Sequence, residues 1–338
     1  MQEQQLGSPE RPDRAAAIAG GGGPQVSPDD IERAAERIRG LVRCTPVLTH
    51  HDPLLGRDIT LKLELLQHAG SFKPRGASNR VRRAQEQTVV PASGLITASG
   101  GNHGAAVSYV AQALGLQAEV FIPSTSPLVK KANIERFGAA VTVVEGIYND
   151  AQAAADERQR TTGALMVHPF DHVDTVAGQG TMSRELESQV DGFETLVVAS
   201  GGGGFTAGQA AWWRERLRVV SVEPETSQCL RAALAAGGPI TVDVSGIAAD
   251  SLGSRRLGDV PWSLVAPFVD DAVVVSDADI RRAQFELWQA FRLVVEPGGA
   301  AAYAALLSGA YRPSANERVV VVVCGANCDP VSVQAPQL

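Results

Sequence analysis

Short apolar segments alternate with helix-like segments along most of this chain. The strand-like segments include LITA, AEVFIP, TLVVA, RVVSVEP and RVVVVV, which are rich in valine and other apolar residues. Segments with helical spacing, such as AAVSYVAQALG and PLVKKANIERFG, lie between them. Apolar strands that alternate with helices are typical of a parallel sheet covered by helices on both faces. The pattern therefore predicts an α/β fold with mainly parallel sheets.

The first 26 residues lack this alternation. They contain GSPERPDR and GGGGP and few apolar side chains, which is typical of a disordered N-terminal arm. Ordered structure is predicted to begin at Ser27, a good helix N-cap that is followed by Pro28 and two aspartates. We expect this first helix to end at Gly40.

Composition narrows the class of protein. The chain has 338 residues, of which 44% are hydrophobic, and a net charge of −7. This suits a globular protein with two domains or one large α/β unit, and the negative charge disfavours a nucleic-acid partner. No long apolar run or secretory leader is apparent, which argues against a membrane location. The 4 cysteines form no CxxC pair, so we expect a cytoplasmic protein.

The segment GSFKPRG, residues 70–76, holds one lysine between an aromatic residue and a proline. Pro74 disfavours helical backbone angles at the preceding residue, so we expect an extended Lys73 just ahead of a helix. Phe72 offers an apolar wall and Arg75 a second positive charge. Desolvation and a neighbouring cation both lower the pKa of an ammonium group. Lys73 is therefore a candidate Schiff-base former, although most lysines merely lie on solvated surfaces.

The loop SGGNHG, residues 99–104, joins the strand LITA to a helix. In parallel α/β sheets, ligands bind beyond the carboxyl ends of the strands. Two adjacent glycines, an amide, an imidazole and a helix N-terminus suit a carboxylate or a ring hydroxyl as ligand. The alternative is a tight strand-to-helix turn in which His103 binds nothing.

The loop SGGGGF, residues 200–205, presents successive backbone N–H groups ahead of a helix, which makes it a candidate phosphate site. Gly202, Gly204 and Ala207 also fit the pattern GxGxxA, and Glu223 ends the next strand. This unit alone therefore also matches a dinucleotide-binding fingerprint. That alternative predicts an NAD-dependent dehydrogenase and leaves Lys73 unexplained.

The loop CGAN, residues 324–327, follows the strand RVVVVV. The thiol of Cys324 could face a heteroaromatic nitrogen as a weak, neutral hydrogen-bond partner. A buried structural cysteine is the alternative interpretation.

Together, these loops and Lys73 resemble the fold type II pyridoxal-phosphate (PLP) enzymes, and among them the threonine/serine dehydratase and serine racemase group. GQGTM (178–182) and VEPGGA (295–300) also resemble segments of this family. The resemblance implies a tryptophan synthase β-like fold with two parallel-sheet α/β domains, the small one inserted in the large one. We expect an arm over 1–26, a large PLP-binding domain over 27–84 and 166–338, and a small domain over 85–165.

The resemblance also implies a role for each loop. Lys73 would form the Schiff base with the cofactor and act as the catalytic base. The residues implied to bind the cofactor are Phe72 against its ring, Lys73, Asn102 at its 3′-hydroxyl, Gly201, Gly202, Gly203 and Gly204 at its phosphate, and Cys324 at its pyridine nitrogen. The residues implied to bind the substrate are Ser99, Gly100, Gly101, Asn102, His103 and Asp250.

The activity implied is β-elimination from L-threonine, L-serine or a related β-hydroxy amino acid, which yields a 2-keto acid and ammonia. Gly100 stands where family racemases have a serine, so we expect little racemase activity. β-Replacement and racemisation remain alternatives, and an intact Lys73 argues against a non-catalytic scaffold. Ser251 replaces the usual glycine after Asp250, which leaves the preferred substrate side chain open.

The family also implies a homodimer that acts on small amino acids. Glu223 resembles one carboxylate of a cation site known in parts of the family, but Cys229 stands where a second acidic ligand is expected. We therefore expect at most a weakly bound monovalent or divalent cation. The chain has no room for the regulatory C-terminal domain of biosynthetic threonine dehydratases, so isoleucine feedback is not expected.

Overall fold

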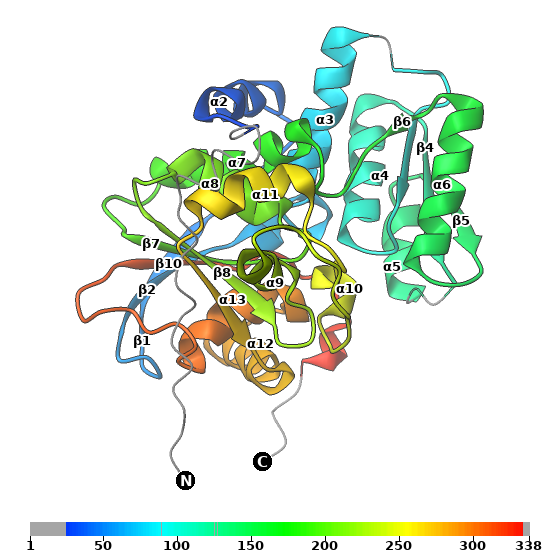
Figure 1. The fold of residues 1–338 in the computed structure, drawn as a ribbon. Coiled ribbons are helices and arrows are strands. Elements are labelled where there is room, and N and C mark those ends of the chain that lie inside the picture. The colour runs from blue at the N-terminus through cyan, green and yellow to red at the C-terminus, as the bar shows by residue number, and fades with distance from the viewer. Residues whose placement is uncertain (1–24, 89, 125, 127, 334–338) are drawn as a thin grey trace.

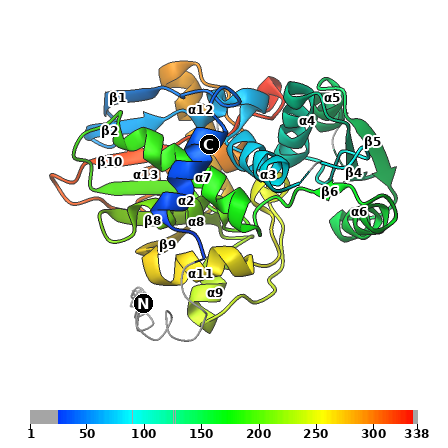
Figure 2. The ribbon, with the colours of Figure 1, turned by 90° about the horizontal axis from the view of Figure 1, so that it is seen from above.

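The computed structural model describes residues 25–333, apart from residues 89, 125 and 127. Its strands form a 6-stranded sheet and a 4-stranded sheet, which lie side by side (Figures 1 and 2). The smaller sheet comes from one continuous stretch of chain between the second and seventh strands, so it is inserted in the larger unit. Most of the predicted N-terminal arm lies outside the described residues. Val26, its last residue, is only 1% exposed and packs in the core of the large unit.

The large sheet has the strand order β1-β2-β10-β7-β8-β9. Its neighbouring strands run parallel, except that β1 pairs antiparallel with β2. The sequence VLTHHD of β1 mixes polar and apolar positions, which suits an edge strand. The alternation of apolar segments did not predict this strand. The strands are β1 (Val47–Asp52), β2 (Arg57–Lys62), β7 (Thr195–Ala199), β8 (Arg218–Pro224), β9 (Asp271–Val275) and β10 (Val319–Val322).

Helices cover both faces of the large sheet, as the strands' apolar character on both faces requires. In Figure 1, α7, α8 and α11 lie above the sheet, and α12 and α13 lie below it. The helices of this unit are α2 (Pro28–Arg37), α3 (Pro74–Gln87), α7 (Val173–Glu187), α8 (Gly204–Trp213), α9 (Cys229–Ala236), α10 (Ala249–Leu252), α11 (Asp259–Phe268), α12 (Asp277–Phe291) and α13 (Pro297–Leu307). Short 3₁₀ turns are η1 (Glu64–Leu66), η2 (His68–Gly70) and η3 (Pro330–Ser332).

The small sheet is entirely parallel, with the order β5-β4-β3-β6. Its strands are β3 (Leu95–Ala98), β4 (Ala118–Pro123), β5 (Ala140–Val144) and β6 (Leu165–Met166), and its helices are α4 (Asn102–Leu114), α5 (Leu128–Glu135) and α6 (Tyr148–Thr162). Two hydrophobic clusters lie on either side of this sheet and are separate from the core of the large unit. The residue limits of the two domains stay a prediction.

The first helix begins as predicted and ends earlier than predicted. The Ser27 hydroxyl accepts a hydrogen bond from the Asp30 amide, and the Asp30 carboxylate accepts one from the Ser27 amide, which forms a capping box. Helix α2 ends at Arg37 rather than at Gly40. The chain turns between these residues, where Gly40 has a φ of +82° that favours glycine.

A buried cluster of charged side chains holds the start of α3 in place. Arg75 is 1% exposed and donates to both oxygens of Glu64, at 2.8 and 2.7 Å, and to Glu185 at 2.9 Å. Lys62 Nζ donates to the other Glu185 oxygen at 2.5 Å. Because Lys62 lies on β2, Glu64 on η1, Arg75 on α3 and Glu185 on α7, the cluster joins four elements around the segment that carries Lys73. Removing one partner of such a buried pair typically costs about 3–5 kcal/mol.

None of the helices that the structure describes combines the length and the apolar character needed to cross a membrane.

Candidate active site

Three of the predicted loops meet between the two sheets, and the side chain of Asn102 joins them. Asn102, the first residue of α4, donates from Nδ2 to Glu296 Oε1 at 2.5 Å. Asn327 donates from its own Nδ2 to Asn102 Oδ1 at 2.8 Å. The Glu296 amide donates to the Gly325 carbonyl at 3.2 Å. The segments SGGNHG, VEPGGA and CGAN are therefore brought into direct contact.

Lys73 lies at the start of α3 with helical backbone angles, φ −55° and ψ −33°. The expectation of an extended Lys73 was wrong. The preference that Pro74 imposes is overcome because the Phe72 carbonyl accepts the Arg75 amide at 3.1 Å and the Lys73 carbonyl accepts the Ala77 amide at 3.2 Å, which extends the helix back over Lys73.

The amine of Lys73 has an unusual environment. Its Nζ donates to the Pro169 carbonyl at 3.2 Å. Desolvation lowers the pKa of Lys73 to about 8, although the negative charge of Glu296 works in the opposite direction. The predicted contribution of Arg75 is not found, because Arg75 points into the ion cluster with Glu64 and Glu185. A larger fraction of Lys73 is therefore in the neutral amine form near neutral pH than is the case for an ordinary lysine.

The imidazole of His103 is turned away from the SGGNHG loop. Its Nε2 lies 2.7 Å from the Val167 carbonyl, which can only accept, so Nε2 carries the proton. Burial lowers the pKa of His103 to about 3, so the ring is neutral and Nδ1 has only a lone pair to offer. The ring is therefore unsuited to binding a carboxylate. The backbone amides of Asn102, His103 and Gly104 in the first turn of α4 remain suited to that task.

Glycines of the SGGGGF loop are packed so closely that a side chain would not fit in their place. A Cβ on Gly202 would lie 2.5 Å from the Phe170 ring, and one on Gly204 would lie 2.7 Å from Phe170 Cβ. Gly203 has a φ of +86° and caps α8, whose first turn leaves backbone N–H groups without helical partners. The Ser200 hydroxyl is buried and has no hydrogen-bond partner within the described residues. This arrangement suits an anion with several oxygen atoms.

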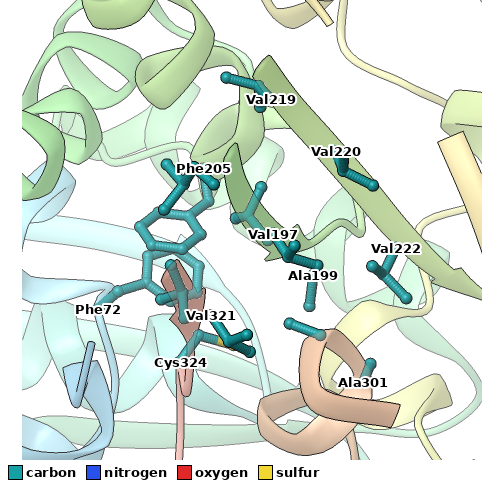
Figure 3. Close-up of a cluster of buried hydrophobic side chains, with 14 of the residues drawn as sticks. Phe72, Val197, Ala199, Phe205, Val219, Val220, Val222, Ala301, Val321 and Cys324 are labelled. Carbon is teal, nitrogen blue, oxygen red and sulfur yellow. The ribbon is translucent and has the colours of Figure 1, made fainter. Parts of the chain in front are cut away.

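Two aromatic rings connect this glycine loop to the segment that carries Lys73. Phe72 stacks on Phe205 with ring centroids 3.9 Å apart and an interplanar angle of 25° (Figure 3). The Phe72 amide donates to the Cys324 carbonyl at 3.2 Å. Burial raises the pKa of the Cys324 thiol well above its ordinary value, so Cys324 is a neutral group. The amine, the glycine loop and the thiol thus belong to one packed unit.

Asp250 lies at the SGGNHG loop, beside a lysine from the small sheet. Lys130 on α5 is 5% exposed, and its Nζ contacts Asp250 Oδ2 at 2.5 Å. A Cβ on Gly101 would lie 3.2 Å from the Asp250 carbonyl oxygen and 3.8 Å from Lys130 Nζ. Sequence reasoning did not identify Lys130, because nothing in PLVKKANIERFG separates it from an exposed lysine.

The comparisons with known proteins decide the family. Residues 38–325 match the family model described as "Pyridoxal-phosphate dependent enzyme". This chain belongs to the pyridoxal-phosphate-dependent enzymes.

Relatives of this PLP enzyme include proteins with different activities. It is 34% identical over 308 residues to a serine racemase of Oryza sativa subsp. indica, which covers 88% of the chain and 90% of the relative. It is also 34% identical over 306 residues to the beta-hydroxyaspartate dehydratase of Paracoccus denitrificans, with 89% and 96% covered. The crystal structure of a threonine deaminase from T.th. matches with a TM-score of 0.83 and 33% identity, and covers 90% of this chain and 99% of that chain. The fold is that of the type II PLP enzymes.

The residues of the site fit pyridoxal phosphate. An amine of lowered pKa, Lys73, is available for the cofactor aldehyde, and the loop before α8 has the close packing and free amides that a phosphate group needs. A neutral thiol at Cys324 and the fixed amide of Asn102 are suited to a pyridine nitrogen and a ring hydroxyl. The roles given to Phe72, Asn102 and Cys324 remain proposals.

Membership of this PLP family removes the dehydrogenase interpretation of GxGxxA. The structure gives a further reason, because the Glu223 carboxylate is not free to bind a ribose. Its two oxygens accept the amides of Leu230 and Arg231 at 2.8 Å each, at the start of α9. Over the described part of the chain, no three His, Cys, Asp or Glu side chains are grouped as a metal site requires. Weak binding of a cation therefore stays a prediction, and Glu223 has no free carboxylate oxygen to support it.

Two functional candidates escaped the sequence analysis besides Lys130. Phe170 packs on the glycine loop, but in the sequence it only ends an apolar stretch, ALMVHPF. Glu296 is 2% exposed, and burial raises the pKa of its carboxyl group to about 7. The segment VEPGGA is indicated by its family resemblance alone, which predicts no role for the Glu296 carboxylate.

Proposed function

We propose that this PLP enzyme catalyses β-elimination from L-threonine, L-serine or a related β-hydroxy amino acid and releases a 2-keto acid and ammonia. The relatives support this reaction class, since a beta-hydroxyaspartate dehydratase and an L-threonine ammonia-lyase are among them. Elimination needs one base for the α-proton, and Lys73 is a buried amine with a pKa of about 8.

The observation that carries the proposal is Gly100. Racemisation requires a second group that delivers a proton to the α-carbon from the face opposite Lys73. Gly100, which lies in the loop expected to hold the substrate carboxylate, has no side chain for this task. Elimination does not need such a group, so the loop is sufficient for a lyase.

Each part of the site has a task in this reaction. The amides at the start of α4 hold the substrate carboxylate, which fixes the α-carbon near Lys73. Lys73 Nζ takes the α-proton. Bound pyridoxal phosphate supplies an electron sink for the charge that develops at the α-carbon. A neutral thiol at Cys324 would not protonate the pyridine nitrogen of the cofactor, so the electron sink stays weak. A weak sink favours prompt loss of the β-hydroxyl group.

A product analysis tests the proposal. The purified protein, supplied with pyridoxal phosphate, is incubated with L-threonine, L-serine and 3-hydroxyaspartate in turn. We expect a 2-keto acid and ammonia in equal amounts from at least one of them, and D-amino acid at a much lower rate. D-product formed as fast as keto acid would overturn the assignment. Added thiol that captures the intermediate would instead indicate β-replacement.

Racemisation is a second candidate because of Ser126. A Cβ on Gly100 would overlap the Ser126 hydroxyl, so a hydroxyl group from another loop stands where a side chain at position 100 would begin. Serine racemases are also among the relatives. If the product analysis finds D-amino acid, the substitution Ser126→Ala is expected to abolish that product and to spare keto-acid formation.

Family resemblance also supports a homodimer, and the 4 cysteines without a CxxC pair favour the cytoplasm. Light scattering of the purified holoenzyme would test the dimer, and fractionation of the source cells would test the location.

A further inference from the structure

Glu296 is a buried carboxyl group at the centre of the site, and the elimination described above does not use it. It precedes α13, and its Oε1 accepts the Asn102 Nδ2 hydrogen bond at 2.5 Å. Its Oε2 is buried and has no hydrogen-bond partner within the described residues. A buried oxygen of this kind is costly unless a ligand supplies a donor or the oxygen carries a proton.

The backbone makes room for this carboxyl group. A Cβ on Gly325 would overlap Glu296 Oε1, so only glycine at position 325 leaves space for it. Asn327 fixes Asn102, and Asn102 in turn fixes the carboxyl group. The unpartnered oxygen is therefore held at a defined place beside the loop that is expected to bind the substrate carboxylate.

Charged and titratable groups from several elements face Glu296. They are Lys73 before α3, Lys130 on α5, Asp250 on α10, and Cys324 and Cys328 after β10. Within the described residues, none of the cations is close enough to Glu296 to form an ion pair, since Lys130 pairs with Asp250 instead. The carboxyl group is thus available for a cation that enters with the substrate.

Amino-acid substrates bring such a cation. An α-ammonium group must lose a proton before its nitrogen has the lone pair needed to attack an electrophilic carbon. In the function proposed above, the amides at the start of α4 hold the substrate carboxylate, and the α-carbon with its ammonium group would then lie near Asn102, the first residue of that helix. Glu296 contacts Asn102, and its charge acts on Lys73.

We propose that Glu296 is the base that accepts the proton of the substrate's α-ammonium group. The N–H bond breaks, its electron pair stays on nitrogen, and an O–H bond forms at Oε2. Two opposite charges become two neutral groups, which lowers the cost of burying them. The proton returns to the ammonia product, which leaves as ammonium. This step rests on the proposed function, because it prepares the amine of the same substrate.

Other groups in the site are less suited to this step. His103 is bonded to Val167 and has a pKa of about 3, and Asp250 is occupied by Lys130. Burial raises the pKa of Glu296 to about 7, which lets it exchange protons with an amine near neutral pH. An ordinary carboxyl group, with a pKa near 4.3, would be a much weaker base.

Glu296→Gln tests the proposal, because glutamine has the same shape and still accepts the Asn102 hydrogen bond. With L-serine as the probe, kcat/KM of the holoenzyme is expected to fall about a hundredfold near neutral pH. The loss should shrink as the pH rises, because the substrate then arrives as the free amine. Glu296→Asp, which keeps an acid, should retain part of the activity and the wild-type form of the pH profile.

A second readout does not depend on turnover. L-alanine has an α-ammonium group and no β-leaving group, so it is a probe of the proton transfer alone. In infrared difference spectra at slightly alkaline pH, adding L-alanine to the wild-type holoenzyme should produce the C=O band of a protonated carboxyl group. Glu296→Gln should lack the band. Asp52→Asn is the control, because it alters a carboxylate buried at the far β1–β2 edge of the large sheet, and this variant should still show the band.

The outcomes separate the two proposals. If wild-type protein eliminates water from L-serine while Glu296→Gln keeps the wild-type pH profile, or if the wild-type band is absent, Glu296 is not the base and the lyase proposal stands. If the wild type yields no keto acid from any substrate and the infrared band still appears, the lyase proposal fails and Glu296 remains the proton acceptor. Thermal melting with added pyridoxal phosphate checks that each variant folds.

Discussion

Lys130 and Asp250 are separated by 120 positions in the chain, and their side chains meet at 2.5 Å. Lys130 belongs to the helix α5 of the small sheet and Asp250 to α10 of the large unit. The pair therefore bridges the two units at the loop expected to bind the substrate carboxylate.

Breaking this bridge is expected to weaken substrate binding more than stability. Asp250 is 44% exposed, so the pair contributes at most about 1 kcal/mol to folding. For Lys130→Met we expect a KM about tenfold higher and a melting temperature that changes little. A double-mutant cycle with Asp250→Asn checks the coupling. Additive effects on KM would contradict a bridge that acts during substrate binding.

Lys73→Ala is expected to abolish turnover and leave the fold intact, because Lys73 takes part in no ion pair among the described residues. Keto-acid release and circular dichroism measure the two effects. In the wild type, borohydride reduction should fix the cofactor on the peptide that contains Lys73. A variant that eliminated water at an undiminished rate would show that another group is the base.

Gly202→Ala is expected to reduce affinity for pyridoxal phosphate by about tenfold or more, since the new Cβ would collide with the Phe170 ring. Titration of the apoenzyme with the cofactor, followed by its absorbance, measures this affinity. Gly238→Ala is a matched control, because a Cβ there meets nothing within 4 Å. Equal affinities in both variants would mean that the loop can relax without affecting the phosphate.

His103 predicts a specific dependence of stability on pH. Burial lowers its pKa from 6.5 to about 3, so the unfolded chain binds the proton first as the pH falls. The stabilisation is complete above pH 6.5 and is lost progressively between 6.5 and about 3, by about 1.4 kcal/mol per pH unit. Urea unfolding of the wild type and His103→Gln at several pH values measures it. Parallel pH dependences would contradict a buried neutral imidazole.

The architecture could be predicted from the sequence because its strands are apolar on both faces and its glycine loops follow strands. The strand β1 was missed because its sequence VLTHHD carries the mixed polarity of an edge strand. For Lys73, the sequence correctly indicated a pKa lowered by desolvation, but the second predicted cause, the charge of Arg75, was wrong. Arg75 lies two residues away in sequence, yet its partners Glu64 and Glu185 come from η1 and α7.

The partners of the site residues could not be predicted, because they depend on how distant segments meet. Glu296 lies 194 positions from Asn102, and the sequence around it does not indicate that its carboxyl group contacts the Asn102 side chain. The orientation of the His103 ring was likewise set by the Val167 carbonyl, which belongs to the chain just after β6. Motifs thus indicated the candidate site, and tertiary contacts decided which partners each of its side chains has.

The inserted position of the small sheet has a consequence for how the specificity of such an enzyme can change. Lys73, the glycine loop and Cys324 all belong to the large unit, whereas SGGNHG and Lys130 lie on one uninterrupted stretch from β3 to β6. Exchanging that stretch between homologues would transplant, in one step, the loop that is proposed to bind the substrate. Lys73 and the glycine loop, which are proposed to hold the cofactor, would stay unchanged. New substrate preferences can therefore arise by recombination without changing the cofactor site.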